Sequence, residues 1–241
     1  MEEKLRSILK RIHWSSLLRA VVFAAAWLYL PLWLFILIAL YLYFIPVPQS
    51  GTVAGPFLVL LLLVLLEPPS ILFAIVFGFV FFYILLIKDL ILIDRKAAYE
   101  VTILFLVFLL FRDFYLREGG AVNAFSLLYS FFTALLVGFL LSNFIRVFKS
   151  HGTQGVWGRF FLRRTAIWLS TILIWQFLVA GLFLPVDFVY QALAAFLAAI
   201  VIVDLVPQYL FGESSRSKVL VTTSVVFVLF VLVLGSARWG L

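Results

Sequence analysis

The sequence predicts an all-α protein, a polytopic bundle of about seven transmembrane helices with the N-terminus in the cytoplasm and the C-terminus outside. Two observations on composition support this fold class: 66% of the 241 residues are hydrophobic and only 12% are charged. A soluble globular domain has about 45–50% apolar and about 25% charged residues. The third observation is that apolar runs are long and unbroken, for example VTILFLVFLLF. Strands of a membrane barrel would instead alternate apolar and polar positions.

Seven apolar segments are the predicted spans, and the connections between them are short. They are residues 18–45, 56–87, 97–117, 122–145, 163–184, 187–210 and 218–236. We expect 18–241 to form one transmembrane domain. Residues 1–17 place Leu5, Ile8, Leu9 and Ile12 at helical spacing with basic residues opposite, which predicts an amphipathic helix lying in the membrane interface.

The second predicted span is interrupted at 67–69, where Glu67, Pro68 and Pro69 stand inside an apolar run. Residues 57–66 would reach only about 15 Å as a helix, half of the ~30 Å hydrocarbon core, whereas 56–87 as one straight helix would be about 48 Å long. Prolines remove amide donors and clash with the preceding turn. Two interpretations stay open: a half-helix that enters from outside and breaks at the prolines, or a bent helix that extends beyond the bilayer.

The distribution of Lys and Arg decides between one crossing and two at this break. With one crossing, only Arg112, Arg117 and Arg238 of the 18 basic residues lie outside, and the other 15 lie inside. If 67–69 were instead a cytoplasmic loop between two full spans, every later segment would flip, and the count would be 8 inside against 10 outside. An excess of Lys and Arg in short loops marks the cytoplasmic side, so the single crossing is predicted.

Three polar residues are candidates for an ion, proton or substrate path. Glu67 lies in the break of the second span, and a carboxylate close to hydrocarbon is typically paired, protonated or exposed to a cavity. Asp204 lies in the sixth span near its inner end, three residues before Pro207. Gln208 follows Asp204 by four residues and therefore shares its helix face, within reach of a hydrogen bond. The alternative is that Glu67 and Asp204 simply face the interface.

A second candidate group lies at the outer end of the third span. Arg112, Asp113 and Arg117 follow an apolar core of eleven residues, 101–111, which as a helix reaches only roughly 16 Å. Asp113 and Arg117 are at the i, i+4 spacing of a helix ion pair. We expect either side chains that extend to the outer surface or an outward-facing pair that gates or binds a ligand.

Basic residues around the longest connection, 146–164, predict contact with anionic lipid headgroups on the cytoplasmic side. They are Arg146, Lys149, Arg159, Arg163 and Arg164. The alternative is that they only anchor the spans in the membrane. Lys88 and Asp89 are expected in a solvated turn on the same side.

Residues for enzyme chemistry are scarce. The chain has no cysteine and two histidines, His13 and His151, both in cytoplasmic flanks. Metal sites need several His, Cys or carboxylate ligands, so we expect no metal and no cofactor. No serine stands in a nucleophile-elbow motif, and we expect a protein that is not an enzyme.

Two classes of function follow. The first is a non-catalytic integral membrane protein, a subunit or assembly scaffold of a membrane complex. The alternative is a small ion or solute transporter or channel that uses the discontinuous second span and the acidic residue in the sixth. Either class resides in a cell membrane (plasma or inner), as a multi-pass protein. The expected partners are the bilayer and other membrane proteins. The net charge of +7 reflects basic flanks of spans and does not indicate nucleic-acid binding.

Overall fold

A computed structural model describes residues 14–45, 53–89, 95–118, 123–147, 156–211, 215–237 and 239. Within these ranges the chain forms nine α-helices and no strand, which confirms the prediction of an all-α protein. Five helical segments are long and apolar enough to cross a membrane, as expected of a membrane protein. The interfacial helix predicted over 1–17 lies almost entirely outside the described residues.

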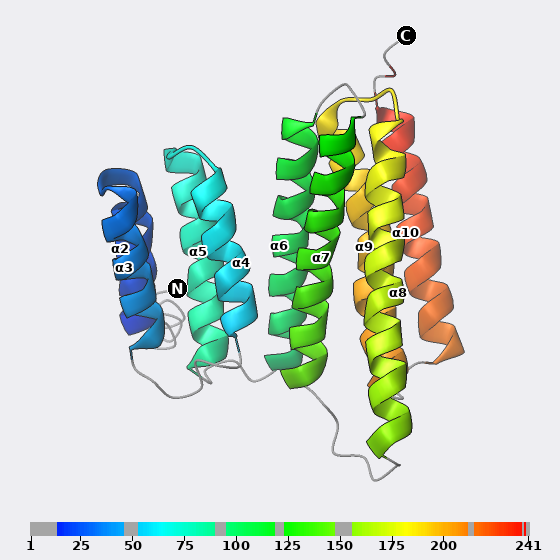
Figure 1. The fold of residues 1–241 in the computed structure, drawn as a ribbon, viewed down its shortest axis with the longest axis horizontal. Coiled ribbons are helices and arrows are strands. Elements are labelled where there is room, and N and C mark those ends of the chain that lie inside the picture. The colour runs from blue at the N-terminus through cyan, green and yellow to red at the C-terminus, as the bar shows by residue number, and fades with distance from the viewer. Residues whose placement is uncertain are drawn as a thin grey trace, which may run out of the picture. The chain divides into compact units, whose positions relative to one another are not determined.

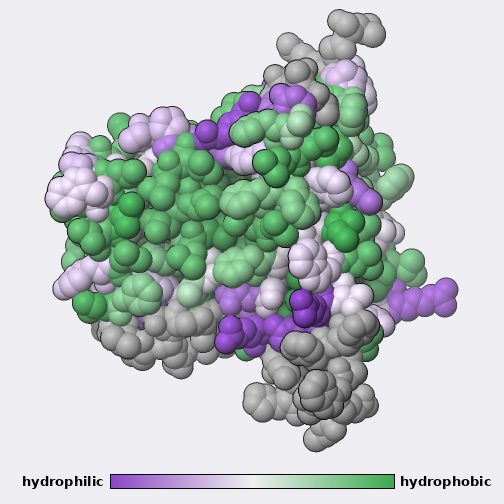
Figure 2. Space-filling model, viewed as in Figure 1, coloured by the Kyte–Doolittle hydropathy of each residue, from purple (hydrophilic) through white to green (hydrophobic). Residues whose placement is uncertain are grey.

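The chain separates into two compact units, Met1–Thr102 and Ile103–Leu241, and the boundary falls inside one helix. The prediction of a single transmembrane domain therefore stays a prediction. On the face seen in Figure 2, hydrophobic residues cover the middle of the helices and hydrophilic residues lie toward the helix ends.

The segment 18–45 is not one continuous helix, contrary to prediction. Helix α2 (Trp14–Tyr29) ends two residues before Pro31, and helix α3 (Leu32–Phe44) begins directly after that proline. Proline has no amide hydrogen and disfavours helical geometry in the residue before it. The chain reverses there, so α3 packs against α2 as a helical hairpin (Figure 1). Mean hydropathy does not register a single proline in an apolar run, which is why the prediction was wrong.

The predicted break at 67–69 is present, and it is also a reversal. Helix α4 (Ala54–Leu66) ends at Glu67, and helix α5 (Ile71–Lys88) begins after Ser70, whose side-chain Oγ accepts a hydrogen bond from the Phe73 amide at 3.3 Å. The two helices pack against each other as a second hairpin (Figure 1). Neither interpretation left open by the sequence, a broken half-helix or a bent helix, describes this geometry.

Aromatic side chains from all four of these helices form the core of the first unit. The Phe23 ring stacks on Phe81 at 4.3 Å and meets Phe35 edge-on at 5.2 Å. The Tyr43 ring stacks on Phe57 with centroids 4.0 Å apart. All five side chains are at most 1% exposed. Because each helix contributes at least one ring, this cluster fastens the two hairpins to each other.

The second unit consists of longer helices. In chain order these are α6 (Arg95–Arg117), α7 (Ala124–Val147), α8 (Val156–Leu182), α9 (Phe188–Phe211) and α10 (Arg216–Ser236). The first turns of α6 belong to the first unit. Helix α7 packs on α8, α8 on α9, and α9 on α10. No residue of α10 is buried within the described structure.

Small residues allow close approach between helices of the second unit. A Cβ atom added to Gly138 of α7 would collide with the side chain of Thr171 on α8, and one added to Gly181 would collide with the Tyr115 hydroxyl. That hydroxyl donates a hydrogen bond to the Leu178 carbonyl at 2.8 Å. Interfaces of this kind, with small residues at the contact, are typical of helices packed in lipid.

Candidate functional site

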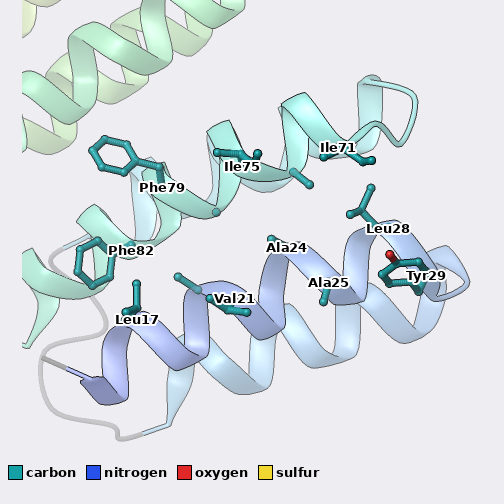
Figure 3. Close-up of a pocket in the computed structure, with 13 residues that line it drawn as sticks. Leu17, Val21, Ala24, Ala25, Leu28, Tyr29, Ile71, Ile75, Phe79 and Phe82 are labelled. Carbon is teal, nitrogen blue, oxygen red and sulfur yellow. The ribbon is translucent and has the colours of Figure 1, made fainter.

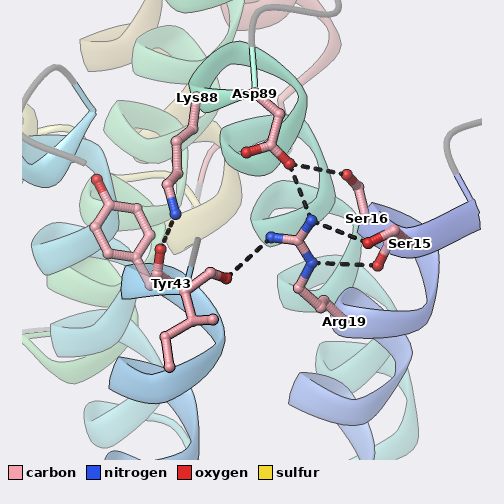
Figure 4. Close-up of polar contacts among 7 residues, drawn as sticks. Ser15, Ser16, Arg19, Tyr43, Lys88 and Asp89 are labelled. Carbon is pink, nitrogen blue, oxygen red and sulfur yellow. Dashed lines mark hydrogen bonds and ion pairs between the residues drawn. The ribbon is translucent and has the colours of Figure 1, made fainter. Parts of the chain in front are cut away.

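A polar cluster joins three helix ends of the first unit (Figure 4). The Arg19 guanidinium of α2 forms an ion pair with Asp89, which follows α5, at 3.1 Å between Nη2 and Oδ2. Arg19 also donates from Nη1 to the carbonyl of Ile45, just after α3, at 3.3 Å. Ser16 donates its hydroxyl to the same Asp89 oxygen at 3.3 Å. We call this end of the first unit its base, and the turns at Pro31 and at 67–70 its tips.

A second cation lies at the base and is buried, with only 1% of Lys88 exposed. Its ammonium group donates a hydrogen bond to the Tyr43 carbonyl and lies 5.0 Å from the centre of the Tyr43 ring (Figure 4). A cation near the face of an aromatic ring is attracted by the ring quadrupole. The expectation that Lys88 and Asp89 form a solvated turn is therefore wrong, because both belong to the contacts that hold the base together.

Glu67, the first predicted path residue, lies at a tip. It caps the C-terminus of α4, its backbone N–H donates to the Leu63 carbonyl at 3.2 Å, and it is 8% exposed. Pro68 and Pro69 beside it are exposed. Glu67 thus occupies the turn of a hairpin, whereas the sequence placed it inside a crossing. A role in ion binding stays a prediction.

The predicted outer group forms a connected set of contacts between α6 and α7. Asp113 is 2% exposed and accepts a hydrogen bond from Arg117 Nε at 2.8 Å, the i, i+4 pair that the spacing predicts. Its other carboxylate oxygen accepts a hydrogen bond from the Tyr129 hydroxyl of α7 at 2.6 Å. Arg112 is partly exposed and has a contact partner of its own. The carboxylate of Asp113 therefore ties two helices together.

Asp204 and Gln208 form the hydrogen bond expected from their spacing, with Gln208 Nε2 donating to Asp204 Oδ1 at 2.5 Å. The second carboxylate oxygen accepts a hydrogen bond from the hydroxyl of Thr222, on α10, at 3.1 Å. Gln208 Oε1 is the one buried side-chain oxygen or nitrogen among the described residues without a hydrogen-bond partner. Asp204 thus connects α10, which buries none of its residues, to α9.

Of the five residues predicted to contact anionic lipid, three have described side chains. Arg146 and Arg164 are exposed, whereas Arg163 is partly buried and donates to the Ser142 carbonyl at 3.1 Å. Lys149 and the side chain of Arg159 lie outside the described residues. Arg163 therefore joins α8 to the end of α7, and of these three described side chains Arg146 and Arg164 are displayed for an outside partner.

A hollow of about 430 Å³ lies between α2 and α5 (Figure 3). It is lined by 13 residues, and every lining side chain is hydrocarbon except for the hydroxyl of Tyr29. At its floor the two helices approach closely, because a Cβ added to Gly78 would lie 3.1 Å from the Cβ of Ala24. Nothing in this lining supplies a charge or a catalytic group. The hollow is suited to hydrocarbon.

The partners that sequence reasoning missed lie on other helices. Spacing identified the pairs Asp113–Arg117 and Asp204–Gln208, because both members are one helical turn apart. Tyr129, Thr222 and Arg19 were missed, because their carboxylate partners are 16, 18 and 70 residues away in the chain. An unpaired acid in an apolar segment is a signal that such a partner exists, but it does not say which residue it is. No group of three metal-ligating side chains occurs among the described residues.

The chain matches no protein-family model, no curated protein and no solved structure.

Proposed function

We propose that this protein is a non-catalytic integral membrane protein, a subunit or assembly scaffold of a membrane complex. One observation carries the proposal: three of the four described aspartates each accept two hydrogen bonds and each tie two helices together. Asp89 accepts from α2, Asp113 from α7 and Asp204 from α10. Carboxylates that hold helices together are already engaged, whereas a transport path needs carboxylates that are open to a passing ion.

The surface of α10 supports this proposal. The most apolar 18-residue stretch of this helix has a mean hydropathy of 2.6, and none of its residues is buried. In the corresponding stretches of the other four candidate spans, between 28% and 50% of the residues are buried. This hydrophobic helix packs on α9, where Thr222 donates a hydrogen bond to Asp204, and offers its remaining apolar surface to another membrane protein. In lipid, such faces associate through close packing of side chains.

The subunit proposal is tested by purifying the protein in mild detergent and weighing the intact assembly by mass spectrometry. We expect other subunits in fixed stoichiometry. Val228→Trp, at an exposed position of α10, should release them, whereas Leu37→Trp, at an equally exposed position of α3, should not. A protein that carries only lipid under these conditions would contradict the proposal.

The membrane topology proposed here differs from the seven-span expectation in one respect. The base contacts bring the start of α2 and the ends of α3 and α5 together, so the chain leaves α3 at Ile45 on the side where α2 begins, just before the connection 46–52. This connection carries no Lys or Arg. The distribution of 15 basic residues inside and 3 outside is therefore the same for two hairpins as for two single crossings, and the positive-inside rule supports both equally.

Single cysteines distinguish the two topologies, since the native chain has none. A cysteine at Ser50 should react with a membrane-impermeant reagent from the cytoplasmic side, like one at Gly155 and opposite to one at Gly119. The seven-span arrangement requires Ser50 and Gly119 to react from the same, outer side. That outcome would contradict the hairpin topology and leave the subunit proposal untouched.

One observation favours the second candidate function, transport of an ion or proton. Gln208 Oε1 is buried beside the Asp204 carboxylate without a hydrogen-bond donor, and a buried acceptor of this kind is satisfied by a proton donor or a cation. Protein reconstituted alone in vesicles should then move an ion down its gradient and lose this activity with Asp204→Asn. Thr223→Val, on the exposed face of α10, is the matched control. Absence of flux in the native protein excludes transport by this chain alone.

A further inference from the structure

We propose that Arg146 and Arg163 together bind the phosphate group of an anionic phospholipid, where α7 ends and α8 begins. They are two of the five basic residues predicted from the sequence to contact anionic headgroups, and they lie where α7 packs on α8. The site is independent of the subunit role, because it involves no residue of α10. Three observations carry it: the nearness of two guanidinium groups, the lack of an acidic partner for them in the described part of the chain, and their position at the ends of two candidate spans.

One hydrogen bond places the Arg163 side chain on α7, next to Arg146. The Arg163 guanidinium donates from Nη2 to the Ser142 carbonyl at 3.1 Å. Ser142 and Arg146 are four residues apart in α7 and therefore lie on one face of that helix, one turn from each other. The positive charge of Arg146 also repels the positive charge of Arg163. Two like charges from different helices are thus held near each other.

No carboxylate compensates this repulsion within the described residues. Arg146 has no hydrogen-bond or ion-pair partner there, and Arg163 has only the Ser142 carbonyl. Three of the four described acids of the second unit, Asp113, Glu118 and Asp187, lie toward the opposite ends of the helices (Figure 1). The fourth, Asp204, accepts hydrogen bonds from Gln208 and Thr222.

A bound anion would supply the missing negative charge. Arg163 is partly buried, and a cation that is partly removed from water needs a counter-charge or hydrogen-bond acceptors in place of the water. Each guanidinium group is a planar fork of N–H donors that matches the oxygens of a phosphate group. The bond to Ser142 occupies one nitrogen of Arg163, and the exposed side chain of Arg146 supplies the second fork. Phosphate is therefore the chemistry that suits this pair.

The position of the pair relative to the spans identifies a lipid as the source of the phosphate. The candidate span of α7 ends at Val147, directly after Arg146, and that of α8 begins at Leu162, directly before Arg163. Trp168, farther along α8, is 49% exposed, and tryptophan is enriched at the boundary between hydrocarbon and water. Phospholipid headgroups lie at this boundary. On the side predicted to be cytoplasmic, anionic lipids attract clusters of basic residues.

Native mass spectrometry of the full-length protein in detergent tests this site. Delipidated protein is incubated with phosphatidylglycerol, or with phosphatidylcholine of the same acyl chains, in which choline cancels the phosphate charge. The wild type should retain phosphatidylglycerol in clear preference to phosphatidylcholine. Arg146→Gln and Arg163→Gln should each reduce retention of phosphatidylglycerol about fivefold, which is the contribution of one Lys or Arg near an anionic membrane surface.

Arg164→Gln is the matched control. Arg164 is exposed and directly follows Arg163, so the variant removes the same charge at almost the same depth. Consecutive residues point about 100° apart around a helix, and Arg164 has no contact with α7 among the described residues. This variant should retain phosphatidylglycerol like the wild type. A loss equal to that of Arg146→Gln would show that any charge at this end suffices, which overturns the two-arginine site.

Helix content and the thermal midpoint establish that each variant is folded. Arg146→Gln removes no contact between described residues, so it provides the comparison even if Arg163→Gln, which loses the bond to Ser142, does not fold. Retention by folded Arg146→Gln equal to that of the wild type overturns the site. Equal retention of the two lipids by the wild type overturns the negative charge of the headgroup.

Inorganic phosphate distinguishes a lipid from a soluble ligand. Phosphatidylglycerol should raise the thermal midpoint of the delipidated wild type and raise that of Arg146→Gln less, whereas inorganic phosphate alone should leave both midpoints unchanged. A rise with inorganic phosphate that equals the rise with lipid, and that is lost in Arg146→Gln, would overturn the lipid as the source. Failure of this site leaves the subunit test at Val228 unaffected, because the two sets of variants lie on different helices.

Discussion

The two units of this protein pack apolar helices in different ways. The first unit uses short helices of 13 to 18 residues, reversed at prolines and joined by stacked rings. The second uses helices of 21 to 27 residues, joined by small residues, by single polar contacts and by ring pairs that meet edge-on or tilted and are not stacked. The Trp175 indole of α8, for example, donates to the Ser130 hydroxyl of α7 at 3.0 Å.

This contrast shows two solutions to one physical problem. Lipid is as apolar as a leucine side chain, so the hydrophobic effect does little to bring helices together within a membrane. Rings that interlock gain dispersion contacts over a large area, which suits short helices with few contacts along their length. Small residues let long helix backbones approach each other along several turns, and one hydrogen bond then sets their register.

Removal of a core ring in the first unit should have the largest effect. Phe81 is fully buried and touches the rings of Phe23 and Phe57. Phe81→Ala should destabilise the protein by about 3–5 kcal/mol, the usual cost of deleting a buried aromatic side chain. Unfolding followed by helix content in mixed detergent measures this loss. Phe79→Ala, two residues away and exposed, should cost less than a third as much, and similar losses for both would contradict an aromatic core.

Enlarging a small residue in the second unit should have an intermediate effect. Gly138→Leu places atoms where the Thr171 side chain lies and should destabilise the protein by about 1–3 kcal/mol through overpacking. Gly235→Leu is the matched control, since nothing lies within 4 Å of a Cβ at that position. Thermal unfolding in detergent compares the two. Equal midpoints would show that close approach does not hold α7 and α8 together.

The smallest effect is expected at the polar contact of α10. Thr222→Val removes the hydrogen bond to Asp204 and should cost about 0.6 kcal/mol, the average for such bonds between membrane helices. Thr223→Val, on the exposed side of the same helix turn, should cost nothing measurable. A double-mutant cycle with Asp204→Asn isolates the contact. A coupling energy of zero would mean that α10 is held by its apolar contacts alone.

What sequence reasoning recovered depends on neighbours along the chain. The helical class, the break at Glu67, and the pairs Asp113–Arg117 and Asp204–Gln208 all follow from runs and spacings within one segment. The reversal at Pro31 was missed, although proline is a local signal, because the surrounding hydropathy outweighed it. The count of Lys and Arg on each side of the membrane could not detect this error. The second reversal returns every later segment to the side predicted for it, and the chain between the two reversals carries no basic residue.

The sequence by itself determined that this chain is helical and apolar enough for a membrane, and where its acids and prolines interrupt the apolar runs. Only the tertiary structure decided that the chain folds back at those prolines, that Asp89, Asp113 and Asp204 each fasten a second helix, and that an open hollow with an apolar lining lies between α2 and α5. The physical reason is range. Composition and helical spacing act between residues a few positions apart, whereas the partner of a buried carboxylate and the walls of a hollow come from segments brought together by packing.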